Sequence, residues 1–222
     1  MRTLFLLFVT LLAFSSPGLI AQEPKKPAPQ DKIDDVPNLP RVLIIGDSIS
    51  IGYTPPLRKL LKDKANVHHN TGNGGDTARG VANVKTWLGT GKWDVIHVNF
   101  GLHDLKFAED KHQVPVADYE QNLRKIVKEL QATGATIIWC STTPVPDAKL
   151  NPVRKNDDVI AYNAAAKKII DEQKIAINDL YSFALPVLKD IQRPANVHFT
   201  DKGSEKLATK VAEEIQKHLK KS

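Results

Sequence analysis

Short runs of apolar residues alternate along the chain with longer segments that are apolar at every third or fourth position. Short continuous runs bounded by Gly, Asp or Asn predict buried strands, whereas the longer amphipathic segments predict helices. Strands are predicted at residues 42–45, 67–69, 94–100, 135–140 and 175–177. Helices are predicted at residues 57–64, 78–88, 116–133, 157–174 and 204–219.

This alternation predicts an α/β fold, a three-layer α/β/α sandwich. Strands that are separated by helices pair in parallel through βαβ units. Strands that are apolar at every position indicate that helices cover both faces of the sheet. We therefore expect a mostly parallel sheet of five strands, in which a ligand binds beyond the carboxyl ends of the strands.

The first 40 residues have a different pattern. A positive start at Arg2 precedes an apolar run at residues 4–14, and small residues follow up to Ala21, which is the layout of a secretory signal peptide. We predict cleavage after Ala21 and export to the periplasm or beyond the cell, with an uncleaved N-terminal anchor as the alternative. Residues 22–40 are rich in Pro, Lys, Gln and Asp and predict a flexible linker. The folded domain is then expected at residues 41–222.

Composition and charge exclude several classes of function. The chain carries a formal charge of +6, but no basic stripe is interleaved with aromatic residues, so we expect no nucleic-acid partner. No second apolar stretch is long enough to span a bilayer, so no stable membrane insertion is expected after cleavage. The single cysteine, Cys140, ends an apolar run and is predicted to be a buried core thiol. We expect a monomer.

Polar segments follow the predicted strands, and the first contains Ser48. Gly46 and Asp47 separate this serine from the buried strand at residues 42–45, so the chain must turn sharply there. A serine at such a turn can present its hydroxyl in a crevice and direct its own N–H toward a developing oxyanion. The alternative is that Asp47, Ser48 or Ser50 only caps the following helix.

The second polar segment, residues 70–77, is rich in glycine. Its accessible backbone N–H groups suit an oxyanion or a phosphate. A phosphate loop would end in Gly-Lys-Ser/Thr, which is missing here. The alternative is a plain turn in which Asp76 or Thr77 caps the next helix.

Two histidines complete the set of candidates. His103 follows the third strand, and His198 lies between two apolar residues just before the last helix. Either imidazole can donate a hydrogen bond or accept a proton near neutral pH. The alternatives are a surface-loop histidine and a packed or capping histidine. His68 and His69 should face opposite sides of a strand and no HExxH pattern exists, so we predict no metal and no cofactor.

In their order and spacing, these segments resemble the SGNH hydrolases, also called GDSL-type lipases and esterases. The resemblance extends over residues 41–219, nearly the whole folded domain. It is carried by four blocks: Ile45-Gly46-Asp47-Ser48, Gly75-Asp76-Thr77, Gly101-Leu102-His103-Asp104 and Val197-His198-Phe199-Thr200. The family's flavodoxin-like α/β/α sandwich agrees with the predicted elements.

The resemblance implies roles for these residues. Ser48 matches the nucleophile and His198 the general base that takes its proton. The N–H groups of Ser48 and Gly75 match two donors of the oxyanion hole. The third donor of the family is Asn in Gly-x-Asn-Asp, and here His103 stands at that position, where an imidazole N–H can still donate.

A second departure concerns the group that orients His198. The family has Asp three residues before this histidine, and here that residue is Ala195. We expect a Ser–His dyad held by a backbone carbonyl, with a displaced Asp190 or Asp201 as the second possibility and an inactive descendant as the third. Further residues that can support the site are Asp47, Asp104, Asn196 and Asp201.

These implications predict an exported serine esterase that forms an acyl-enzyme on Ser48. We expect a small-molecule or carbohydrate ester as substrate, favouring short acyl groups such as acetyl on carbohydrate over a lipid ester, because aromatic residues are few, at 6%. A noncatalytic glycan-binding module on the same fold is the rival interpretation, motivated by His103 and Ala195.

Overall fold

Five short apolar segments pair into one sheet in the computed structural model, which describes residues 33–219. The strands are β1 (Arg41–Ile45), β2 (Asn66–His69), β3 (Val95–Val98), β6 (Thr136–Cys140) and β7 (Ala176–Asn178). All four neighbouring pairs are parallel and the strand order is β2-β1-β3-β6-β7. The predicted fold class is confirmed, and the order is that of flavodoxin-like sheets.

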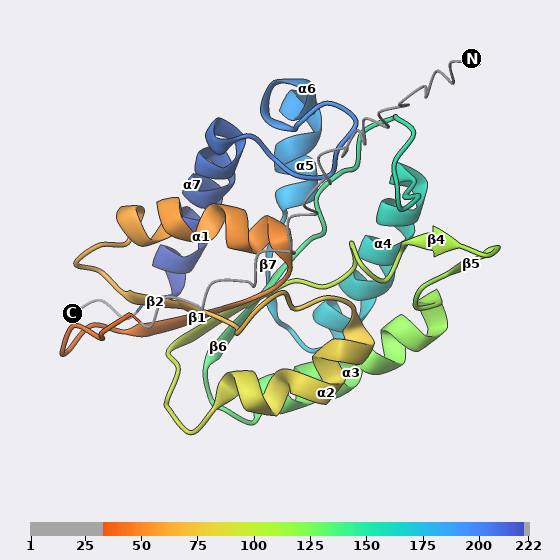
Figure 1. Ribbon diagram of the computed structural model, residues 1–222. Helices are drawn as coiled ribbons and strands as arrows, with labels where there is room; N and C mark the ends of the chain where they lie inside the picture. The colour runs from red at the N-terminus through yellow and green to blue at the C-terminus, as the bar shows by residue number, and fades with distance from the viewer. Residues whose placement is uncertain (1–32, 220–222) are drawn as a thin grey trace, which may run out of the picture.

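Helices cover both faces of this sheet (Figure 1). The main helices are α1 (Ser48–Leu60), α2 (Thr77–Leu88), α3 (Val116–Gln131), α4 (Asn156–Glu172) and α7 (Asp201–His218). α1 and α7 pack side by side on one face, while α2, α3 and α4 form the layer on the opposite face. The strands therefore lie between two helical layers, which explains the continuous apolar runs at residues 42–45 of β1 and 137–140 of β6.

Each face of the sheet has its own hydrophobic core. Leu43 and Ile45 of β1 pack among side chains of α2, α3 and α4, whereas Val42 and Ile44 pack among those of α1 and α7. Successive residues of a strand point to opposite faces, so one continuous apolar run serves both cores. Cys140 is buried with 2% of its surface exposed, as predicted.

The first helix begins earlier than the expected range of residues 57–64. α1 starts at Ser48, and it contains Pro55 and Pro56, which remove two backbone donors. The carbonyls that lose these donors belong to Ile51 and Gly52, which lie on the exposed face of the helix, where water can bind them. The helix start was therefore predicted too late, directly after the two prolines, because proline usually interrupts a helix.

Several short elements were not predicted. They are the hairpin of β4 (Phe107–Ala108) and β5 (Lys111–His112), the helices α5 (Leu180–Ala184) and α6 (Leu188–Ile191), and the 3-10 turn η1 (Leu185–Val187). The last helix also begins at Asp201 instead of residue 204, because the Thr200 hydroxyl accepts from the Gly203 N–H and caps it.

The expected signal peptide lies outside the described residues, as does most of the expected linker. The last part of the linker, residues 33–40, contacts β2 at the edge of the sheet. There the Asn66 side chain accepts a hydrogen bond from the Val36 N–H at 2.9 Å and donates one to the Val36 carbonyl at 3.0 Å. Asp35 bonds to Arg41 and His68. Within residues 33–219, no helix combines the length and the apolar character that a membrane crossing requires.

The strand order fixes where a ligand can bind. β1 is flanked by β2 on one side and β3 on the other, so the chain leaves β1 and β3 in diverging directions at their carboxyl ends. This divergence opens a crevice at the switch point of an α/β sheet. Ser48 follows β1 and His103 follows β3, so both predicted site residues lie at this crevice.

Candidate active site

Ser48 and His198 meet although 150 residues separate them in the chain. Ser48 is the first residue of α1, and His198 lies just before α7, the helix that packs beside α1. The Ser48 Oγ lies 2.9 Å from His198 Nε2, within hydrogen-bond distance. Both side chains are half-buried, so a solvent-borne molecule can reach them.

Asn196 fixes the orientation of the His198 ring. Its Oδ1 accepts from the backbone N–H of His198 at 2.9 Å, which identifies this atom as the amide oxygen. The same oxygen lies 2.7 Å from His198 Nδ1, so Nδ1 carries a proton. In the neutral ring the lone pair is then on Nε2, the atom that faces Ser48. The acceptor is therefore a side-chain amide, and not the expected backbone carbonyl or carboxylate.

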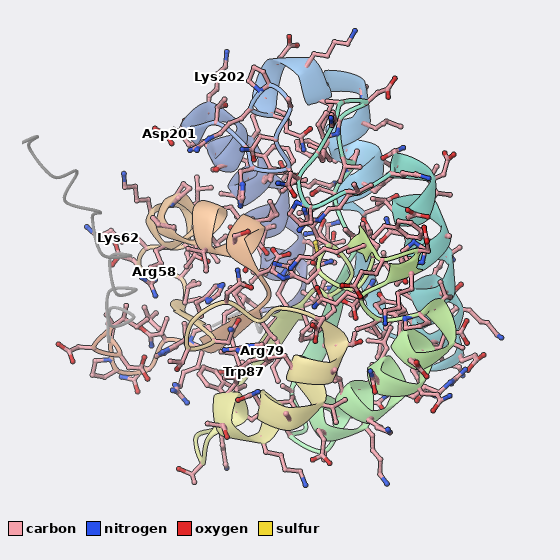
Figure 2. All side chains as sticks on the ribbon, turned by 45° about the vertical axis from the view of Figure 1, so that its right-hand side comes forward. Arg58, Lys62, Arg79, Trp87, Asp201 and Lys202 are labelled. Carbon is pink, nitrogen blue, oxygen red and sulfur yellow. The ribbon has the colours of Figure 1, made fainter. Side chains whose placement is uncertain are left out.

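The carboxylates considered for this role lie elsewhere. Asp201 is exposed at the outer end of α7 (Figure 2), and Asp190 is exposed on α6. Ala195, at the family's usual Asp position, has a φ of 46°, a left-handed conformation that is uncommon for a residue with a Cβ. This turn places the following residue, Asn196, against His198.

Burial and nearby cations keep His198 neutral. Desolvation lowers the pKa of His198 from its ordinary value of 6.5, and the charges of Arg193 and Arg154 lower it further. A lower pKa means that the imidazole stays unprotonated, and able to accept a proton, at pH values somewhat below neutrality.

His103 has a defined tautomer. The Lys106 ammonium can only donate, and it lies 3.0 Å from His103 Nδ1, which must therefore accept. Burial lowers the pKa of His103 to about 4, with Lys106 and Arg154 adding to the effect, so the ring is neutral. The proton of this neutral ring is on Nε2, which makes His103 a hydrogen-bond donor at neutral pH.

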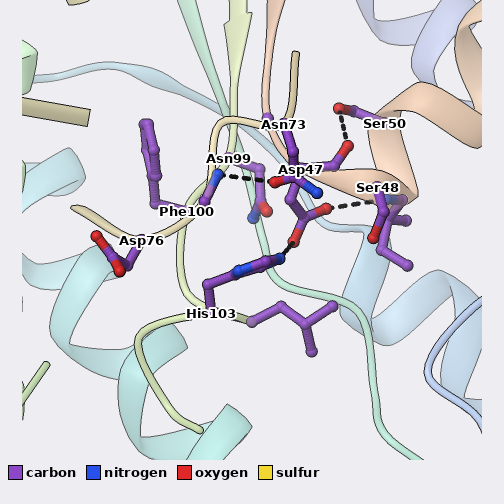
Figure 3. Close-up of polar contacts among 12 residues, drawn as sticks. Asp47, Ser48, Ser50, Asn73, Asp76, Asn99, Phe100 and His103 are labelled. Atoms are coloured by element: carbon purple, nitrogen blue, oxygen red, sulfur yellow. Dashed lines mark hydrogen bonds and ion pairs between the residues drawn. The ribbon is translucent and has the colours of Figure 1, made fainter. Parts of the chain in front are cut away.

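Asp47 lies between the serine and this histidine (Figure 3). Its Oδ1 accepts from the N–H of Ile49 at 2.9 Å and caps α1, and its Oδ2 lies 3.9 Å from His103 Nε2. Its backbone carbonyl accepts from the Ser50 hydroxyl at 2.7 Å. Burial raises the pKa of this carboxyl. Asp47 therefore holds the turn that presents Ser48.

The glycine-rich segment packs directly on the turn after β1. The N–H of Gly74 donates to the Gly46 carbonyl at 2.8 Å, and a Cβ at Gly74 would lie 2.7 Å from that oxygen. Gly75 has a φ of 70°, and its N–H donates to Asn73 Oδ1 at 2.8 Å. This predicted oxyanion donor is thus engaged by a side chain that itself lines the cavity.

Asp104 ties the third segment to the second. Its Oδ1 accepts from the N–H and the hydroxyl of Thr77, at 2.8 and 2.5 Å, while its buried Oδ2 has no protein partner within the described range. Burial raises the pKa of Asp104 to about 7. Asp104 therefore supports the loops of the site and makes no contact with His198.

A cavity of about 360 Å³ opens in front of the Ser48 hydroxyl. Its walls come from the loops after β1, β2 and β3, from the segment before α4 and from the turn before α7. They include Ser48, Asn73, Leu102, His103, Arg154, Ala195, Asn196 and His198. The arrangement suits nucleophilic attack by Ser48 on a carbonyl carbon, with proton transfer to His198.

Two cations of this site, Lys106 beside His103 and Arg154 in the cavity wall, were not predicted from the sequence. The one sequence feature that could have predicted Lys106 is its spacing of three residues from His103. No motif surrounds Arg154, so nothing in the sequence marked it. Among residues 33–219, no group of three His, Cys, Asp or Glu side chains is placed so that it could hold a metal ion.

Comparison with known families finds a match over most of the folded domain. A sequence profile of the GDSL-like lipase/acylhydrolase family matches residues 44–206, a range that contains Ser48, Gly75, His103 and His198. No curated protein sequence matches the chain.

Solved structures share the fold at low identity. A lipase/acylhydrolase from Enterococcus faecalis is 23% identical, covering 83% of this chain and 99% of its own, with a TM-score of 0.71. The acetyl xylan esterase AlAXEase is 17% identical, covering 79% and 99%, with a TM-score of 0.68. Axe2, an acetylxylan esterase from Geobacillus stearothermophilus, is 21% identical, covering 79% and 94%, with a TM-score of 0.67. At these identities the likeness concerns the fold.

Proposed function

Because this chain belongs to the GDSL-like lipase/acylhydrolase family, we propose that it is an exported serine esterase in which Ser48 forms an acyl-enzyme. The substrate is an ester of a short acyl group, such as an O-acetyl group on a carbohydrate. Export rests on the signal-like pattern of residues 1–21.

One observation carries the assignment of the nucleophile. The Ser48 Oγ and His198 Nε2 lie 2.9 Å apart at the wall of a cavity, and Asn196 directs the lone pair of the imidazole toward the hydroxyl. A serine hydroxyl is a weak nucleophile until a base removes its proton, and this is the geometry that such a transfer requires.

In acylation, Ser48 Oγ attacks the carbonyl carbon of the ester and its proton moves to His198 Nε2. The tetrahedral intermediate then collapses, the bond between the carbonyl carbon and the alcohol oxygen breaks, and His198 returns the proton to the departing alcohol. In deacylation a water molecule takes the place of the alcohol. His198 accepts its proton, and the acid leaves as Ser48 recovers its hydrogen.

The negative charge of the intermediate needs donors that are already in place. The N–H of Ser48 belongs to the first turn of α1 and has no acceptor within the helix, and the helix dipole favours negative charge there. His103 supplies its Nε2–H. The N–H of Gly75 becomes the third donor once Asn73 turns away from it, so Asn73 is a side chain that substrate must displace.

Two features support a short acyl group on carbohydrate. The cavity is small, about 360 Å³, and seven of its twelve lining residues are polar. The solved structures that share this fold include two acetyl xylan esterases by name. Acetyl on a sugar fits a site of this size better than a long acyl chain does.

A fluorophosphonate probe tests the assignment, because it reacts with activated serines. We expect one probe adduct per chain, located on Ser48 by peptide mass spectrometry, and no labelling of Ser48→Ala. Ser50→Ala is the matched control, since Ser50 lies one helical half-turn away and also contacts a histidine. Labelling of Ser48→Ala equal to that of the unaltered protein would refute the nucleophile.

A panel of 4-nitrophenyl esters separates the esterase from the noncatalytic glycan-binding module. We expect the acetate to be turned over faster than longer acyl esters, with Ser48→Ala as control. Equal rates in the two proteins would remove the enzyme claim and favour the binding module.

A further inference from the structure

Arg154 lines the same cavity as Ser48 and His198. Its Nε donates to the Leu102 carbonyl at 2.8 Å, and its Nη1 lies 3.4 Å from the Pro152 carbonyl. These two bonds hold the guanidinium plane against the cavity wall. Within the described part of the chain, Nη2 makes no hydrogen bond, and no carboxylate lies within 4.0 Å of the guanidinium.

The charge of Arg154 is only weakly compensated. Burial lowers the pKa of Arg154, and among residues 33–219 the one carboxyl that compensates its charge is Asp47, which caps α1. Arg154 in turn lowers the pKa of His198, and Lys106 adds a second cation near the same cavity. A half-buried guanidinium with an open donor carries a desolvation cost, which an anion in the cavity would relieve.

From this placement we propose that the cavity takes esters that carry a carboxylate, bound by Arg154 while the ester carbonyl lies at Ser48. The guanidinium fork matches a carboxylate in shape and charge. This inference rests on the proposed function and narrows its substrate class. The carboxylate belongs either to the alcohol part, as in an acetylated uronic acid, or to the acyl part, as in a half-ester of a dicarboxylic acid.

Two matched pairs of esters test both sources. O-acetylgalacturonic acid is compared with O-acetylgalactose, and monomethyl glutarate with methyl pentanoate, by acid release. We expect kcat/KM to favour the charged member of one pair, and the preference to fall roughly tenfold in Arg154→Gln. Arg154→Lys, which keeps the charge without the fork, should retain part of the preference.

Lys155→Gln is the matched control. Lys155 is the next residue along the chain and is exposed, and its ammonium lies over the Phe107 ring outside the cavity lining. Its loss removes the same charge from the same segment and should leave the preference unchanged. A preference that falls equally in Lys155→Gln would overturn a local role for Arg154, as would a preference that Arg154→Gln leaves intact in both pairs.

Binding to Ser48→Ala separates failure of this inference from failure of the proposed function. Calorimetry with the same four esters reports affinity without turnover. In one of the two pairs the charged ester should bind more tightly than its neutral partner, and a second substitution, Arg154→Gln, should remove the difference. Selective binding without any turnover by the unaltered protein would refute the esterase and retain the anion site. Equal affinity for the charged and the neutral ester in both pairs would refute the anion site.

Discussion

Two serines in the first turn of α1 each pair with a histidine, and of these two pairs only Ser48–His198 lines a cavity large enough for a substrate. Ser48 Oγ is 2.9 Å from His198 Nε2, and Ser50 Oγ is 2.7 Å from His69 Nε2. Each histidine also bonds an oxygen through Nδ1, at 2.7 Å for His198 and 2.8 Å for His69. By distances alone, the two pairs are equivalent.

Their surroundings differ. Ser50 is 2% exposed and borders a space of only about 10 Å³, too small for a substrate. The single hydrogen of its hydroxyl donates to the Asp47 carbonyl and is not available to His69, and burial lowers the pKa of His69 to about 4. Ser48 instead lines a cavity of about 360 Å³ together with the His103 donor. A serine–histidine hydrogen bond is therefore insufficient for catalysis, which also needs access and donors for the oxyanion.

Removing each hydroxyl in turn is the most direct test of whether the two pairs differ in function. Ser48→Ala should lower kcat/KM by roughly 10⁴-fold or more, because it removes the nucleophile. Ser50→Ala should retain most of the activity, because this buried hydroxyl borders a space too small for substrate and the Asp47 cap of α1 stays in place. Rates with 4-nitrophenyl acetate give the answer, with thermal unfolding as the control for folding. Similar losses in both variants would show that the buried pair has a chemical role.

Removing the oxyanion donor His103 should lower the activity of the Ser48–His198 pair, which makes it more similar to the buried Ser50–His69 pair. His103→Ala should lower kcat by about 10²-fold, because one donor to the oxyanion is lost. His103→Asn should retain much more activity, since its amide can donate from the same position. Single-turnover kinetics would measure both. Unchanged activity in His103→Ala would exclude His103 as a donor, and complete loss in His103→Asn would indicate a separate chemical task.

The acceptors of the two histidines can also be distinguished, because His198 Nδ1 bonds the side chain of Asn196 and His69 Nδ1 bonds the backbone carbonyl of Asn70. Asn196→Ala should lower kcat/KM by roughly tenfold, or about 1.4 kcal/mol, as the ring loses its fixed orientation. Asn196→Asp places a carboxylate beside Nδ1–H and should raise the pKa of His198 by about one to three units.

The pH dependence of kcat/KM measures this shift. His198 must be neutral to accept the Ser48 proton, so activity rises with pH through the pKa of His198. In the unaltered protein this rise should lie below pH 6.5, because that pKa is lowered. In Asn196→Asp the rise should move to higher pH. An unmoved profile would mean that Asn196 does not contact the ring in solution.

The smallest effect is expected from an exposed charge near the active pair. Arg193 lowers the pKa of His198, so Arg193→Gln should move the same rise to higher pH by a fraction of a unit. The shift should shrink at high salt, because an exposed charge is screened. Lys189→Gln, on the exposed surface of α6, is the matched control. Equal shifts in the two variants would mean that the pKa of His198 responds to the overall charge of the protein and not to Arg193 in particular.

The sequence predicted the sheet and the location of the site because both depend on burial patterns. Continuous apolar strands between amphipathic helices required a parallel sheet covered on both faces. Parallel strands end at one edge, which brought the segments of Ser48, Gly75 and His103 together. The start of α1 and the small hairpin at β4 and β5 escaped prediction, because prolines and two-residue strands leave no periodic signal.

Hydrogen-bond partners were decided only by the tertiary structure. Apolar periodicity records which residues are buried, but not where a side chain points once the chain has turned. Asn196 against His198, Lys106 against His103 and Arg154 in the cavity wall all depend on local dihedral angles and on loops far apart in sequence. The sequence by itself thus determined which chemistry the crevice can hold, and only the folded chain decided which serine–histidine pair opens to a substrate.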